Sequence, residues 1–117
     1  MNVLFVCTAN IQRSKTAESV FKQLIKGVSK IRISSAGTDA MIDAGGVQLT
    51  KEMIESADRI FVMEDFHEKY IVDLVLDSQD KIVNLDVPDV YYRDDPYLIL
   101  QLREKLEPYA RELKKRK

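Results

Sequence analysis

The chain has 117 residues, 45% hydrophobic and 32% charged, a length and composition that predict one domain over residues 1–117 and exclude a disordered or membrane-spanning chain. The formal net charge of −1 excludes a broad positive field that would gather nucleic acid or anionic lipid, so any anion site should be local. Residues 1–7 lack the basic flank and cleavage site of a signal peptide, which predicts a cytoplasmic protein.

The first half of the chain alternates short apolar runs with helical stripes. Residues 3–6 form a continuous, β-branched-rich run that predicts a buried strand ending directly at Cys7. Apolar residues then recur at helical spacing and predict a helix over residues 14–28. A second strand is predicted over residues 31–35, and the glycines and aspartates of residues 36–46 predict an irregular loop.

The second half continues this alternation. A short helix is predicted over residues 49–54 with Thr50 as its N-cap, and strands are predicted over residues 59–63 and 82–85. Between those strands, the stripe of Phe66, Tyr70 and Leu74 predicts another helix.

The closing helix is predicted to begin at Asp95 and Pro96, because aspartate can cap and proline suits the first helical position. Pro108 lies inside its pattern and should kink or divide it, and the basic residues 114–117 should be a solvated helix end. Strands alternating with helices predict a three-layer, doubly wound, four-stranded parallel sheet.

The loop after the first strand holds the candidate chemistry, because ligands of open α/β sheets bind beyond the carboxyl ends of strands. It reads Cys7-Thr8-Ala9-Asn10-Ile11-Gln12-Arg13-Ser14. Successive amides of a tight loop and the start of a helix can form a concave anion site. Cys7 is the chain's one cysteine, so it is either a packing residue or a reactive thiol beneath that site. Arg13 is the residue type suited to a two-point hold on a phosphoryl group.

This loop, with the preceding strand Val3-Leu4-Phe5-Val6, resembles the low-molecular-weight protein tyrosine phosphatase family, in a short prokaryotic branch. The resemblance extends through Ser35-Ala36-Gly37-Thr38, Ile60-Phe61-Val62-Met63-Glu64 and Val87-Pro88-Asp89-Val90-Tyr91-Tyr92, and so covers nearly the whole chain. It implies the flavodoxin-like strand order 2-1-3-4 and a cysteine-dependent protein tyrosine phosphatase. Ala9 stands where the family usually has glycine, and Gln12 where it often has a second cysteine.

The resemblance also implies roles for individual residues. Cys7 would be the nucleophile and Arg13 the phosphate ligand, while the Ser14 hydroxyl would bond to the thiolate. Asn10 would support the loop conformation through Ser35. The phosphate would be bound by the loop residues Thr8, Ala9, Asn10, Ile11, Gln12 and Ser14.

Three aspartates in the loop after the fourth strand compete for the role of general acid. Asp89 fits the family's acid pattern except for Val90 at its proline position, whereas Asp95 has a ready task as a helix N-cap, so Asp89 is favoured. Asp94 is expected to be solvated. Tyr91 would then line the substrate slot.

The expected function is hydrolysis of phosphate monoesters through a phosphocysteine intermediate, with a phosphotyrosine-containing protein or small aryl phosphate as substrate. No cofactor, metal, nucleic acid or membrane is expected to take part, and the chain should be a monomer or weak dimer. Two alternatives remain open: an arsenate reductase that depends on an external thiol, and a phospho-ligand binding or carrier module that does not hydrolyse. His67 is interpreted as an early residue of a surface helix rather than as a catalytic group.

Overall fold

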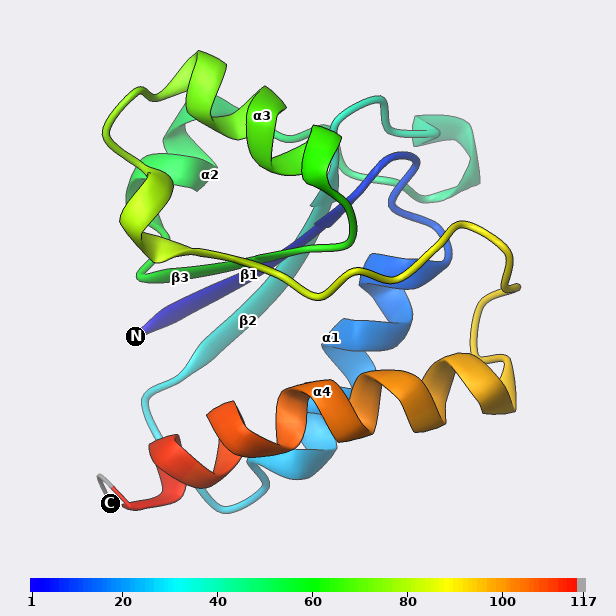
Figure 1. The fold of residues 1–117 in the computed structure, drawn as a ribbon, viewed down its shortest axis with the longest axis vertical. Coiled ribbons are helices and arrows are strands. Elements are labelled where there is room, and N and C mark those ends of the chain that lie inside the picture. The colour runs from blue at the N-terminus through cyan, green and yellow to red at the C-terminus, as the bar shows by residue number, and fades with distance from the viewer. Residues whose placement is uncertain (116–117) are drawn as a thin grey trace.

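A computed structural model describes residues 1–115 and shows a sheet of four parallel strands in the order β2-β1-β3-β4 (Figure 1). The strands are β1 (Asn2–Cys7), β2 (Arg32–Gly37), β3 (Arg59–Val62) and β4 (Ile82–Asn84). Parallel neighbours need crossover connections, and the helices between the strands supply them. The expected fold class and strand order are therefore confirmed.

Helices cover both faces of the sheet. The helices are α1 (Arg13–Leu24), α2 (Lys51–Ser56), α3 (Asp65–Leu74) and α4 (Pro96–Lys115), with short 3₁₀ turns η1 (Ile42–Ala44) and η2 (Gln79–Lys81). In Figure 1, α1 and α4 pack together on one side of the sheet, and α2 and α3 lie on the other. The central strand β1 is therefore enclosed on both faces, as its unbroken apolar run predicts.

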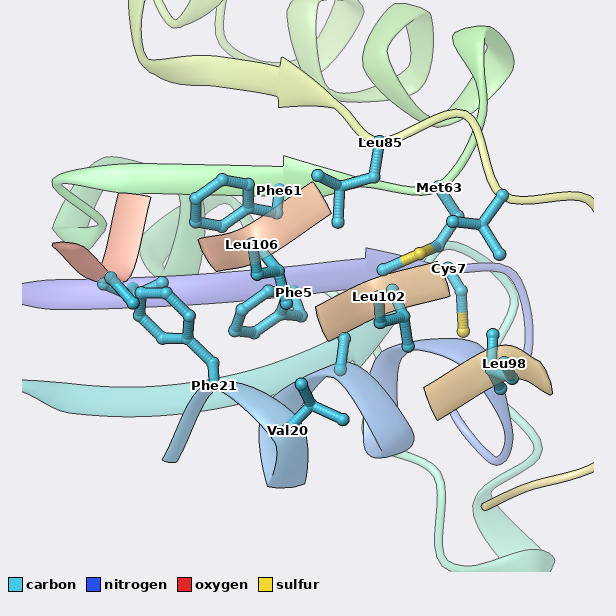
Figure 2. Packing of buried hydrophobic residues seen from close by; sticks show 14 of the residues in the cluster. Phe5, Cys7, Val20, Phe21, Phe61, Met63, Leu85, Leu98, Leu102 and Leu106 are labelled. Atoms are coloured by element: carbon cyan, nitrogen blue, oxygen red, sulfur yellow. The ribbon is translucent and has the colours of Figure 1, made fainter. Parts of the chain in front are cut away.

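Side chains of β1 alternate between the two halves of the core. Val3, Phe5 and Cys7 belong to the half beneath α1 and α4, whereas Leu4 and Val6 belong to the half beneath α2 and α3. Figure 2 shows Cys7 at the end of the first half, beyond the rings of Phe5 and Phe61, which stack with centroids 5.1 Å apart. The packing of β1 thus fixes the point at which Cys7 leaves the sheet.

Helices α1 and α4 each differ from the prediction in one respect. Helix α1 ends at Leu24 rather than Val28, because the chain turns and reaches a left-handed conformation at Gly27, with φ of 92°. Helix α4 runs undivided through Pro108 (Figure 1). Lys114 and Lys115 end it at exposed positions, as expected, while 116–117 of the basic tail lie outside the described residues.

The predicted stripe of α3 is wrong in its direction. Phe66, Tyr70 and Leu74 are 55%, 37% and 42% exposed, while the buried side chains of this helix are His67 and Ile71. The helix is turned so that the imidazole of His67 reaches the loop after β1. A specific polar contact has therefore overridden the apolar periodicity.

Over the described residues, no helix is long and apolar enough to span a membrane.

Candidate active site

The loop of residues 8–12 lies between the end of β1 and the start of α1, and backbone hydrogen bonds join it to the segment after β2. The carbonyls of Cys7, Thr8 and Ala9 accept hydrogen bonds from N–H groups of the segment after β2, at 3.0, 2.9 and 3.0 Å. With these carbonyls engaged outward, the concave side is left to N–H groups. That arrangement suits an anion.

Two glycines allow the segment after β2 to approach this loop. A Cβ atom on Gly37 would lie 2.3 Å from the Thr8 carbonyl oxygen, and one on Gly46 would lie 2.6 Å from that of Ala9. Any side chain at either position would push the two backbones apart. The glycines therefore permit the hydrogen bonds that shape the loop.

The Cys7 sulfur is buried and faces two polar groups of its own loop. The Ser14 Oγ lies 2.9 Å from Sγ, and the Asn10 backbone N–H donates to Sγ at 3.3 Å. The Asn10 side chain, oriented by accepting the Val47 N–H, donates to Ser14 Oγ at 2.7 Å. This donation leaves the Ser14 hydroxyl proton free to point at sulfur, the direction that a thiolate requires. Asn10 adopts φ of 57°, the left-handed conformation that asparagine tolerates.

The N-terminus of α1 adds to this polarity. Gln12, its N-cap, makes no side-chain capping bond, and the first turn contains no acidic residue. The first amides of a helix lack intrahelical partners and carry partial positive charge. An anion held by residues 8–12 would therefore also meet the positive end of α1.

Arg13 is almost fully buried and is fixed by two strong acceptors. Its Nη1 donates to Glu64 Oε2 at 2.6 Å and to the Val87 carbonyl at 2.8 Å. Both hydrogens of Nη1 are thereby used, which holds the guanidinium plane in one orientation. Within the described residues, the nearest ion-pair partner of Nε is Asp89, at 3.7 Å. The edge formed by Nε and Nη2 is thus the one left for a two-point contact with phosphate.

The structure separates the three candidate acids. Asp89 is brought to Arg13, with its carboxylate 62% exposed. Asp95 accepts the Tyr97 N–H at 2.8 Å and so caps α4, as expected. Asp94, with a carboxylate that is also 62% exposed, donates its backbone N–H to Thr16 Oγ1 at 2.9 Å.

The structure shows other contacts for two further predicted residues, Ser35 and Tyr91. Ser35 donates to Glu18 Oε1 at 2.6 Å, so the expected support of Asn10 through Ser35 is wrong; Val47 and Ser14 fill that role. The Ser35 hydroxyl instead donates its proton to a carboxylate of α1. Tyr91 is partly buried against the core, whereas its neighbour Tyr92 is 79% exposed, so a slot role for Tyr91 stays a prediction.

Comparisons with known proteins agree with this geometry. Residues 2–46 match the family model described as low molecular weight phosphotyrosine protein phosphatase. The matched residues run from β1 to the loop after β2 and so include the whole of residues 7–14. A Klebsiella pneumoniae protein, named provisionally as a low molecular weight protein-tyrosine-phosphatase, is 29% identical over 120 residues, covering 80% of this chain and 81% of its own. The Bacillus subtilis protein-arginine-phosphatase is 27% identical over 143 residues, covering 98% and 95%.

Solved structures of phosphatases share the fold of this chain. A mutant of the YwlE arginine phosphatase with a phosphorylated active-site serine has 26% identity, a TM-score of 0.78 and coverage of 98% and 97%. The tyrosine phosphatase Wzb from Escherichia coli K30, in complex with phosphate, has 24% identity, a TM-score of 0.79 and coverage of 96% and 97%.

Two residues of the candidate site are not predicted from the sequence, and both come from the region after β3. Glu64 holds Arg13, and the ring of His67 is fully buried between Thr8 and the backbone of Glu64. The available signal was position: β3 neighbours β1, so residues following β3 lie at the same edge of the sheet as Cys7.

The pKa of His67 is lowered from 6.5 to about 4, by burial and then by the positive charge of Arg13. Between pH 6.5 and 4 the unfolded chain therefore binds a proton that the folded chain does not, so stability is complete above pH 6.5 and falls as pH drops toward 4. We expect up to about 3 kcal/mol of unfolding free energy to be lost through this group. Denaturant titrations of wild type and His67→Gln across this range should differ in slope with pH; parallel curves would contradict the prediction.

Proposed function

We propose that this protein hydrolyses phosphate monoesters through a phosphocysteine intermediate on Cys7. The observation that carries the proposal is the buried Cys7 sulfur, which accepts the Asn10 N–H at 3.3 Å and lies 2.9 Å from Ser14 Oγ. The thiolate is the nucleophilic form of a cysteine, and N–H and O–H donors at these positions can hydrogen-bond to it. A thiolate placed against a bound phosphate is a nucleophile facing its electrophile.

In the first step the Cys7 thiolate attacks phosphorus, the S–P bond forms and the ester P–O bond breaks. Loop amides and the free edge of Arg13 stabilise charge on the equatorial oxygens. Asp89, next to Arg13, donates its proton to the departing oxygen.

In the second step water hydrolyses the phosphocysteine. The Asp89 carboxylate, left ionised by the first step, takes a proton from the water that attacks phosphorus. The S–P bond breaks, inorganic phosphate leaves and Cys7 returns as a thiolate. A reactive thiol persists best in a reducing compartment, which supports a cytoplasmic location.

Phosphotyrosine in a protein is the substrate class we favour. Val90 and Tyr92, which follow Asp89 in the chain, are 72% and 79% exposed and offer apolar surface to an aromatic ring. Phosphoarginine is the second candidate, because the B. subtilis relative that covers 98% of this chain is named protein-arginine-phosphatase.

The proposal is tested by release of phosphate from an aryl phosphate with and without EDTA, and from two peptides of one sequence that carry phosphotyrosine or phosphoarginine. We expect turnover of the aryl phosphate that EDTA leaves unchanged and vanadate inhibits, and faster release from the phosphotyrosine peptide. Loss of activity in EDTA would contradict the mechanism. Preference for the phosphoarginine peptide would reassign the substrate but keep Cys7 and Arg13.

Asp89→Asn should slow hydrolysis of phenyl phosphate about 10²- to 10⁴-fold and that of p-nitrophenyl phosphate much less, because nitrophenolate leaves with little protonation. The measurement is kcat for both substrates at one pH. Asp95→Ala serves as the control, since loss of an N-cap should cost about 1 kcal/mol of stability without dependence on the leaving group. If Asp95→Ala alone showed that dependence, the acid would be Asp95. If neither variant showed a dependence on the leaving group, the result would favour the alternative function, a carrier or binding module that does not hydrolyse its ligand.

A further inference from the structure

His67 lies between the two parts of the candidate site, and both of its ring nitrogens are engaged. Nδ1 accepts the Glu64 backbone N–H at 3.1 Å, so in the neutral ring the proton lies on Nε2. Nε2 then donates to Thr8 Oγ1 at 2.9 Å. A buried imidazole with one acceptor and one donor bond has a fixed tautomer and orientation.

The two partners of the imidazole lead to different catalytic groups. Thr8 directly follows Cys7, and its carbonyl is tied to the Asp39 N–H on the other side. Glu64 holds the guanidinium of Arg13 at 2.6 Å. The loop that follows Cys7 and the carboxylate that holds Arg13 are therefore joined through one side chain, the imidazole of His67, whose hydrogen bonds go to Thr8 and Glu64.

We propose that His67 is a positioning residue of the phosphatase site, holding Thr8 and Glu64 in register and through them the phosphate loop and Arg13. The inference rests on the proposed function. A histidine that only filled a cavity would need no hydrogen-bond partners. Helix α3 instead buries the ring of His67 and leaves the apolar side chains of Phe66, Tyr70 and Leu74 exposed. The neutral ring suits the role, because a protonated Nδ1 could no longer accept the Glu64 N–H.

The test compares two replacements of the ring. His67→Phe keeps the aromatic shape and removes both hydrogen bonds, whereas His67→Gln keeps a neutral donor and acceptor at the same position. We expect His67→Phe to lose about 10²-fold in kcat with a smaller change in KM, since misplaced groups weaken transition-state contacts most. His67→Gln should recover most of this loss.

A control and a cycle separate positioning from general stability. Ile71→Ala removes the other fully buried side chain of α3, one turn further along; it should lower the melting temperature but keep kcat per folded molecule. Thr8→Val removes the acceptor hydroxyl at constant shape. If the two residues act through one hydrogen bond, the double variant Thr8→Val/His67→Phe should be little slower than the slower single variant. Its kcat should then be at least tenfold higher than the product of the two single losses predicts.

Three results for the variants would overturn the positioning role of His67. A folded His67→Phe with kcat within twofold of wild type would overturn the proposal, as would an equal loss in Ile71→Ala or fully multiplicative losses in the cycle. If wild type turned over no phosphate ester, the proposed function would fail, and the positioning role would be read from protection of Cys7 against iodoacetamide by inorganic phosphate. Weaker protection in His67→Phe, restored in His67→Gln, would support the role; equal protection in all three would overturn it.

Discussion

Replacing Cys7 with serine should abolish turnover of aryl phosphates while leaving the phosphate loop able to bind the anion. The loop should keep its shape, because the carbonyls of residues 7–9 still accept N–H groups of the segment after β2. A serine hydroxyl stays protonated at neutral pH and is a far weaker nucleophile than a thiolate. We expect kcat to fall on the order of 10³-fold or more, as when the nucleophile of a covalent mechanism is removed.

Binding in the Cys7→Ser variant is measured by thermal unfolding in phosphate or vanadate. A ligand at 100 times its Kd should stabilise the folded chain by about 2.7 kcal/mol, so the melting temperature should rise in both proteins. Intact mass after incubation with substrate checks for a trapped phosphoserine, which would appear once per molecule without turnover. A serine variant that still turns over substrate would remove Cys7 from the mechanism. A variant that neither reacts nor binds would mean that its loop had collapsed.

The residues identified from sequence are those whose geometry is local. Cys7, Asn10, Arg13 and Ser14 lie within one strand, loop and helix start, so their spacing along the chain nearly determines their spacing in space. The observed contacts of Sγ with Ser14 and Asn10 follow directly from that short segment. Asp95 could likewise be recognised as an N-cap, because a cap is set by its neighbours in sequence.

The residues that sequence reasoning missed or misplaced depend on pairings between distant segments. Glu64 reaches Arg13, 51 positions away in sequence, because β3 pairs with β1. The predicted support of Asn10 by Ser35 is wrong, because the packing of α1 on β2 brings Glu18 within 2.6 Å of the Ser35 hydroxyl. The predicted buried face of α3 is wrong, because hydrophobic periodicity gives no weight to a buried histidine that has two hydrogen-bond partners.

Substituting Arg13 with lysine should remove most activity although the positive charge is kept. The arginine uses Nη1 for Glu64 and Val87 and leaves its Nε and Nη2 edge for the phosphoryl oxygens. A lysine ammonium is a single point of donation, so it cannot satisfy Glu64 and Val87 and also present a flat, two-point edge. We expect a fall in kcat of about 10²- to 10³-fold, the effect of losing one well-placed transition-state donor.

The control is Arg93→Lys, the same exchange at an exposed arginine that lies 4.0 Å from Asp94 in the loop after β4. It should keep wild-type kcat and KM, because exposed ion pairs of this kind contribute little. Glu64→Gln completes the series: it keeps an oxygen acceptor for Nη1 but removes the charge, so activity should fall less than in Arg13→Lys. If Arg13→Lys retained wild-type kcat, a simple positive charge would suffice at this site, and the fixed orientation imposed by Glu64 and Val87 would have no catalytic use. If Glu64→Gln were instead as slow as Arg13→Lys, the orientation of the guanidinium would account for the whole of its contribution.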